Sequence, residues 1–336
     1  MRISRGALLT AISSVVALGL LIGGFIAFTG SGKHDTGADH TAQGGGGQLR
    51  SPFTGEPIHA LRRELIFKID NVVQARPPTG LTKADIVYLL PVEGGLSRIF
   101  AVFSSHVPPV VGPVRSSREE DIALLRQFGR PAFAFSGAQP RLLPVVEHAR
   151  IVNLYAGVVG GYYRDPRRIA PYNLYAHTKT LLAEAKGASK ARDIGFRFGS
   201  APPGGKPTTV YNVGYRAAAF SIRWSAAQHR WLIGMDGRQA TVADGTKLGA
   251  RTVVVQYVNV GTSRFLELGI RPPYAHTVGS GSAVVLRGGR AYKVHWSRPT
   301  ADGGTTFTLP DGDRMPFARG QVWVIYGFGP GSSRQQ

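Results

Sequence analysis

Charged side chains stand at the ends of three short apolar runs between residues 84 and 118. Each run is rich in Val, Ile, Phe and Tyr and is bounded by Gly or Pro, which predicts three strands joined by tight connections. Guanidinium groups fixed by strand ends can grip a phosphate or carboxylate with two N–H groups. The sequence therefore predicts an anion-binding site, and the alternative is that acids and arginines pair to brace the sheet. The candidate residues are Asp85, Glu93, Arg98, Arg115 and Arg118.

A second polar cluster lies between residues 160 and 178, where arginines alternate with tyrosines. A loop of this composition suits recognition of a phosphate or a sugar, and a solvated surface loop is the alternative. His177 has no evident partner, so a structural role is favoured over that of a general base, and no catalytic residue is assigned. The candidate ligand-binding residues here are Arg164, Arg167, Arg168 and Asn173.

These residues need an α/β (α+β) domain to position them, which we predict over residues 51–187. Strands are expected at 64–73 and 132–135, and helices at 119–128, 141–149 and 178–186. Ser116 or Ser117 would cap the first helix. Arg115 and Arg118 would then lie at a helix N-terminus, where free N–H groups favour an anion.

The chain beyond residue 188 predicts a linker over 188–207 and an all-β sandwich or barrel over 208–330. About eight alternating segments are separated by Asp-Gly and Gly-Gly turns, which is typical of hairpins. The ionisable residues there are mostly arginines. We therefore expect a binding or packing module without a catalytic group.

The N-terminus predicts a membrane anchor over residues 1–30. Gly6 to Phe28 carries no charge and is long enough to span a bilayer, and Arg2 and Arg5 precede it, so the later domains should lie outside the cytoplasm. Secretion after signal cleavage is the alternative. Residues 31–50, with four consecutive glycines, should form a flexible tether.

Composition narrows the choice of partners. The chain has 336 residues, a formal net charge of +20 and a pI near 10.7. This charge predicts attraction to an anionic partner, such as a wall polymer or a lipid-linked ligand. The alternative is that the excess of arginine reflects a coding bias of the genome. Export makes nucleic acid an unexpected partner. The absence of cysteine excludes disulfides and thiolate metal sites, and no cofactor is expected.

The order of these features resembles the YerB-type exported proteins of Gram-positive bacteria, a family of unknown function. Members are often lipoproteins anchored through a cysteine, so the resemblance implies that a helix anchors this chain. Tyr172 and Phe135 to Ala138 stand where the family pattern has histidines, which leaves a histidine-dependent mechanism without support. The matching segments include Pro52 to Gly55, Ile69 to Asn71, Ala84 to Tyr88, Val92 to Gly95, Gly112 to Ser116, Asn173 to Tyr175, Val278 to Gly281 and Gly320 to Trp323.

The order of predicted strands, arginine-bearing loop and helices also looks like that of the LytR-CpsA-Psr transferases, which hold a polyprenyl pyrophosphate with arginines; the similarity is one of arrangement alone.

Three hypotheses follow for the function. The first is a binding protein for an anionic envelope ligand. The second is an enzyme acting on phosphate-linked wall precursors, in which Asp85 and Glu93 hold Mg²⁺. The third is an envelope scaffold whose β domain carries the interface.

Overall fold

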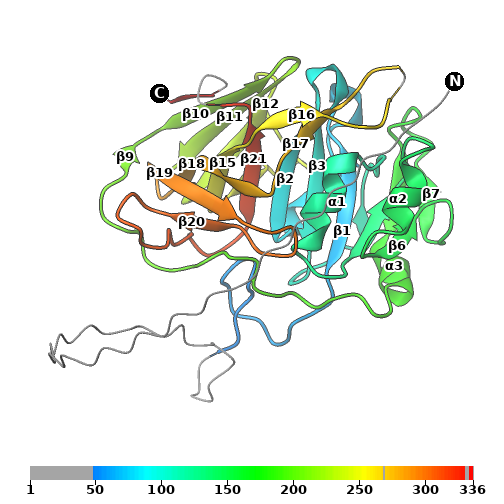
Figure 1. The fold of residues 1–336 in the computed structure, drawn as a ribbon, viewed down its shortest axis with the longest axis horizontal. Coiled ribbons are helices and arrows are strands. Elements are labelled where there is room, and N and C mark those ends of the chain that lie inside the picture. The colour runs from blue at the N-terminus through cyan, green and yellow to red at the C-terminus, as the bar shows by residue number, and fades with distance from the viewer. Residues whose placement is uncertain (1–47, 268, 330–332, 336) are drawn as a thin grey trace, which may run out of the picture. The chain divides into compact units, whose positions relative to one another are not determined.

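A single mixed sheet runs through most of the chain in the computed structural model, which describes residues 48–267, 269–329 and 333–335 (Figure 1). The predicted membrane anchor and almost all of the tether lie outside these residues, and none of the helices within them is both long enough and apolar enough to cross a bilayer. The sheet order is β20-β19-β18-β15-β21-β2-β3-β1-β5-β6, with β9 beside β19. These strands are β1 (Leu65–Asp70), β2 (Ile86–Pro91), β3 (Ser97–Phe103), β5 (Ala132–Phe135), β6 (Val152–Tyr155), β9 (Lys206–Pro207), β15 (Thr252–Tyr257), β18 (Gly279–Arg287), β19 (Arg290–Arg298), β20 (Thr306–Thr308) and β21 (Val322–Gly327).

Strand β21 joins the two halves of the chain. It pairs in parallel with β2 on one side, where Ile86 faces Val322, and with β15 on the other, where Thr252 faces Val322. Every residue of β2 and β21 is buried, as expected for parallel strands covered on both faces. The prediction of a separate all-β sandwich or barrel is therefore wrong. Several of its strands, β15 and β18 to β21, continue the sheet of the first half of the chain.

The remaining strands of the second half form a smaller sheet that packs on one face of the large one. Alternate side chains of β1 point to opposite faces: Phe67 lies in a core with Phe220 and Trp231 of the smaller sheet, and Ile66 lies in a core with Leu124 of the helix α1 (Glu119–Arg126). The smaller sheet contains β10 (Val210–Tyr215), β11 (Ala218–Ser225), β12 (Arg230–Met235), β13 (Arg238–Gln239), β14 (Gly249–Ala250) and β22 (Ser333–Gln335).

Strands are the main secondary structure of the described residues, and the helices are short. The helices are α1 (Glu119–Arg126), α2 (Leu143–Glu147) and α3 (Thr178–Glu184), with 3-10 turns η1 (Val73–Ala75), η2 (Leu81–Lys83) and η3 (Glu93–Gly95). Two small sheets complete the fold: β4 (Val110–Val111) with β8 (Leu174–His177) and β7 (Tyr162–Arg164), and an arm formed by β16 (Val260–Thr262) and β17 (Pro273–Ala275). The segment predicted as a linker is packed against the protein, since Ile194 and Phe196 are buried in the core.

Candidate functional site

The candidate site lies at the carboxyl ends of three neighbouring parallel strands, β1, β5 and β6. Asp70 ends β1, Ser136 follows β5 and Tyr155 ends β6. Ligands of parallel sheets commonly bind at this edge, because the loops that leave the strands surround a crevice there. A cavity of about 560 Å³, here called the first cavity, opens at this place. Its lining includes Arg115, Ser116, Ser136, Tyr155, Tyr162, Tyr163 and Arg164.

The backbone of Arg115 is held by hydrogen bonds, while part of its guanidinium group has no hydrogen-bond acceptor among the described residues. Its N–H donates to the carbonyl of Lys68 at 2.8 Å, and its own carbonyl accepts from Ser136 at 3.1 Å. The guanidinium Nε lies 2.8 Å from a carboxylate oxygen of Asp70, and the ring of Tyr172 lies 6.0 Å away. Its terminal nitrogens donate no hydrogen bond to any residue that the structure describes, so they remain available to an oxyanion.

Arg164 enters the same cavity from strand β7. It is exposed, and Nη1 donates to Oδ1 of Asn173 at 2.7 Å. Asn173 in turn donates to the carbonyls of Asp165 and Arg168 at 3.4 and 3.2 Å, which holds the loop closed. Asn173 therefore positions Arg164 and is not itself part of the cavity lining.

The other two arginines predicted in this loop lie outside the lining of the first cavity. Arg167 has 87% of its side chain exposed and pairs with Asp165 at 2.9 Å. Arg168 donates to the carbonyls of Ala75 and Pro77, both at 2.8 Å, and so ties its loop to the turn after β1.

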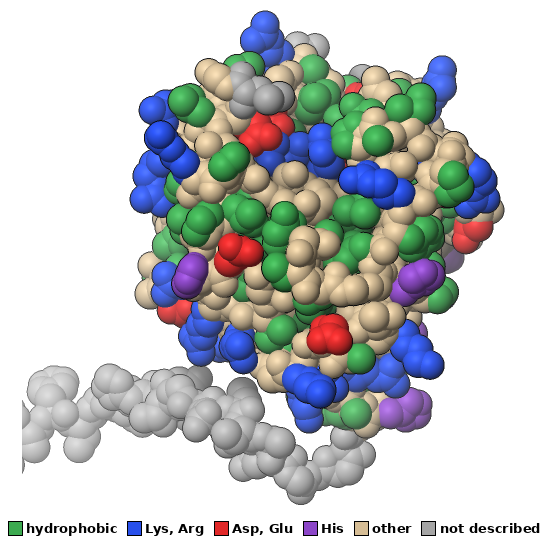
Figure 2. Space-filling model, turned by 90° about the vertical axis from the view of Figure 1, so that its right-hand side faces the viewer, with side chains coloured by type: hydrophobic (Ala, Val, Ile, Leu, Met, Phe, Trp, Pro, Cys, Tyr) green, Lys and Arg blue, Asp and Glu red, His purple; other side chains and the backbone are tan. Residues whose placement is uncertain are grey.

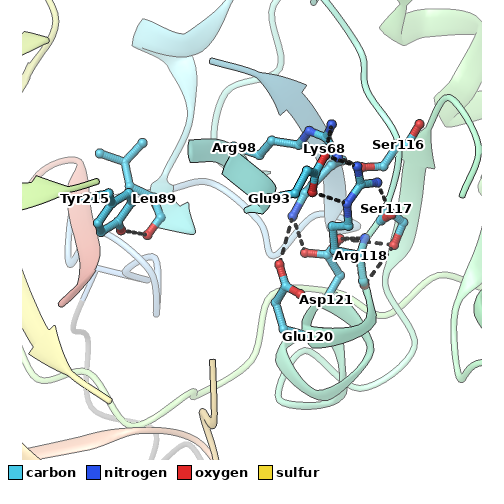
Figure 3. A network of polar contacts seen from close by, with 10 residues as sticks. All are labelled: Lys68, Leu89, Glu93, Arg98, Ser116, Ser117, Arg118, Glu120, Asp121 and Tyr215. Carbon is cyan, nitrogen blue, oxygen red and sulfur yellow. Dashed lines mark hydrogen bonds and ion pairs between the residues drawn. The ribbon is translucent and has the colours of Figure 1, made fainter. Parts of the chain in front are cut away.

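Arg98 and Arg118 close on Glu93 from two sides, and we call these three residues the arginine clamp (Figure 3). Arg118 Nε donates to Glu93 at 2.9 Å, its Nη2 makes a second short bond to the same carboxylate, and Arg98 Nη2 lies 3.2 Å from it. Arg98 and Arg118 are only 5% and 2% exposed. The bracing interpretation is therefore the one that fits these two residues, because the fold already supplies their counterion.

Electrostatics in the arginine clamp follow from burial and pairing. Burial alone would raise the pKa of Glu93, but the hydrogen bond from Arg118 and the charges of Arg98 and Arg118 outweigh it and bring the pKa to about 2. Burial and the neighbouring Arg118 lower the pKa of Arg98 to about 10. The clamp also supports the first cavity, since Arg98 Nη1 donates to the carbonyl of Ser116 at 3.2 Å.

A buried charge pair lies beneath the arginine clamp and was missed by sequence reasoning (Figure 3). Lys68 is fully buried, and its Nζ lies 2.5 Å from Asp121 Oδ1. The other oxygen of Asp121 accepts from Ser117 Oγ at 3.1 Å and from the backbone of Arg118 at 2.8 Å. Glu120 is buried beside them without a hydrogen bond to its carboxyl group, and burial raises its pKa. The only signal in the sequence is a lysine inside an apolar run.

Asp85 does not belong to this group. It precedes β2 while Glu93 follows it, and a strand of this length separates them by roughly 25 Å. The Asp85 carboxylate accepts from the backbone of Ser104 and Ser105 at 2.6 and 2.8 Å, and burial raises its pKa to about 6 against these bonds. The prediction that Asp85 and Glu93 hold one metal ion is therefore wrong. No cluster of three metal-ligating side chains occurs among the described residues.

Two successive segments of the chain match models of one protein family. Residues 53–192 match the N-terminal domain, and residues 210–324 the C-terminal domain, of the protein family of unknown function DUF3048. A stretch of 84 residues is 42% identical to "Putative lipoprotein YerB" of Bacillus subtilis, and this alignment spans only 24% of the present chain and 25% of that protein. The crystal structure of YerB from Bacillus subtilis superposes with a TM-score of 0.75 at 22% identity, covering 86% of this chain and all of the other. The resemblance inferred from the motifs is confirmed, and the chain belongs to the DUF3048 family, as a homologue of YerB with both of the family's domains.

Proposed function

We propose that this protein is a membrane-anchored extracytoplasmic protein that binds an anionic ligand of the cell envelope in the first cavity. The observation that carries the proposal is the meeting of Arg115 and Arg164 in one concave site, with the terminal nitrogens of Arg115 unused by the described residues. Within the part of the chain that the structure describes, Asp70 is the one carboxylate paired with them, so the two arginines leave a net positive charge for the ligand.

The uncharged lining narrows the ligand class. Two serine hydroxyls, Ser116 and Ser136, can donate to phosphate oxygens, and three tyrosines can pack against a sugar ring or a lipid chain. A phosphate-bearing wall precursor or polymer combines these properties. Figure 2 supports an anionic partner more broadly, because basic side chains outnumber acidic ones on the face that it shows and lie mainly toward its periphery.

The location outside the cytoplasm rests on two observations. The uncharged segment from Gly6 to Phe28 follows two arginines, as in a signal anchor. The Bacillus subtilis relative is named "Putative lipoprotein YerB", and a lipoprotein is held at a membrane by its lipid. We infer that this chain reaches the same place with the helix as its anchor.

Titration calorimetry of the full-length protein in detergent tests the proposal, with farnesyl phosphate and glycerol-phosphate oligomers as probes. Arg115→Gln and Arg164→Gln should each weaken binding about tenfold or more, since each removes a charge-assisted hydrogen bond. Arg167→Gln is the matched control, because it removes the same charge three residues from Arg164 but outside the lining of the cavity. Equal affinity in all three variants would refute the proposal.

A further inference from the structure

A second cavity, of about 320 Å³, opens at the other end of the central strands of the large sheet, where β2 begins. Both family domains contribute to it. The first supplies Glu56, Lys83, Asp85 and His106, and the second supplies Arg230 and Arg251. The two cavities are separate sites. The second lies at the start of β2, whereas Glu93 and the first cavity lie beyond the end of this strand.

Three cations line the second cavity, and neither lining carboxylate, Glu56 or Asp85, forms an ion pair with any of them, so the lining keeps a net positive charge. Arg230 Nε donates to the Gln228 side chain at 3.0 Å, and Arg251 Nη1 donates to the carbonyl of His229 at 2.8 Å. These neutral acceptors fix the guanidinium groups without cancelling their charge. Within residues 48–267, 269–329 and 333–335, no Asp or Glu oxygen forms an ion pair with Lys83, Arg230 or Arg251.

Asp85 adds a fixed acceptor to the same cavity. Two backbone N–H groups, of Ser104 and Ser105, hold its carboxylate in place, and the residue is 2% exposed. The cavity thus has a positive part, made of Lys83 from η2, Arg230 from β12 and Arg251 between β14 and β15, and a buried hydrogen-bond acceptor near the start of β2. An inorganic anion would use the cations alone, whereas a phosphate ester with a hydroxyl group would use both features.

We propose that the second cavity binds a hydroxyl-bearing phosphate ester. Lys83, Arg230 and Arg251 hold the phosphate, and the Asp85 carboxylate accepts a hydrogen bond from the hydroxyl group. The ligand would contact both family domains at once, because the cations come from both of them.

The test uses full-length protein carrying Arg115→Gln and Arg164→Gln, so that the first cavity does not contribute. Calorimetry compares glycerol 3-phosphate, which has hydroxyl donors, with sulfate, which has none. We expect saturable binding of glycerol 3-phosphate, tighter than that of sulfate by about tenfold. Lys83→Gln combined with Arg251→Gln should weaken the binding of both ligands about tenfold or more. Asp85→Asn should reduce only the preference for glycerol 3-phosphate, because an amide oxygen accepts a weaker hydrogen bond than a carboxylate does.

Arg223→Gln is the control, because this exposed arginine lies on β11 of the same small sheet and does not line the cavity. No saturable binding in this background, or unchanged affinity in the Lys83 and Arg251 double variant, would overturn the proposal. The Asp85→Asn variant loses the carboxylate that accepts two backbone hydrogen bonds, from residues 104 and 105, and it can therefore fail to fold. In that case the double variant at the exposed Lys83 and Arg251 still tests the proposal. Failure here leaves the first cavity untouched, since that site is tested with its own variants.

Discussion

Glu93→Gln tests whether the arginine clamp is a structural brace. The pKa of Glu93 falls from 4.5 to about 2 in the folded protein, and a shift of this size corresponds to about 3 kcal/mol of unfolding free energy at pH 7. The side chain is 22% exposed, so solvent screens it only in part. Because the folded pKa is depressed, this stabilisation is complete well above the unfolded pKa and is lost as the pH falls toward 2.

Urea unfolding followed by tryptophan fluorescence measures the effect at two pH values. The variant should lose about 3 kcal/mol at pH 7 and only about half as much at pH 3. At pH 3 the Glu93 carboxyl group is already protonated in the unfolded chain, while in the folded protein, with its pKa near 2, it is still mostly ionised. Glu267→Gln is the matched control: its carboxylate lies 3.2 Å from the same Arg118, but the resulting loss should stay below about 1 kcal/mol, as for a single partly exposed pair. A loss below about 1 kcal/mol at pH 7 for Glu93→Gln, or one independent of pH, would refute the reasoning.

Two further predictions concern the elements that hold the site. Lys68→Met should cost about 3–5 kcal/mol of unfolding free energy, because it leaves the buried Asp121 carboxylate without its cation; calorimetric melting measures this, and a loss below about 1 kcal/mol would contradict it. Gly95→Ala should destabilise the protein more than Gly94→Ala. Both glycines have a positive φ, near 75° and 72°, but only at Gly95 would an added Cβ lie 2.5 Å from Arg216 Cβ, whereas the nearest atom at Gly94 is 3.8 Å away. Equal melting temperatures of the two variants would show that the close approach does not matter.

The local elements could be predicted from the sequence because their signals are local. The strand at residues 132–135 is confirmed with the same bounds, and the helix predicted from 119 is confirmed over Glu119–Arg126. Apolar runs and helical spacing depend only on neighbouring residues, so these elements are visible without the fold. The same holds for the predicted strand that starts at Arg98, which is β3. Arg164, by contrast, lies at the end of strand β7, in a segment that was predicted as a loop.

The assembly of the site could not be predicted in the same way. Asp85 and Glu93 are close in the sequence, but the extended strand β2 lies between them, so they stand at opposite ends of that strand. The pairing of Glu93 with Arg118 was one of two open interpretations, and only the burial of the arginines separates it from ligand binding. The partner of Lys68 lies on a helix distant in the chain, which no periodicity reveals.

The position of β21 has a consequence for how the chain acquires its structure. Ile86 faces Val322, so the slot beside β2 stays empty until nearly the whole polypeptide has been synthesised. Until then β2 presents an unpaired, wholly apolar strand edge, which is a template for unwanted pairing with other chains. Pairing between such distant segments also slows folding, because a long loop must close first. A chain that stops before Val322 would retain both family segments almost intact and still lack the strand that joins them, so it would keep the edge of β2 unpaired.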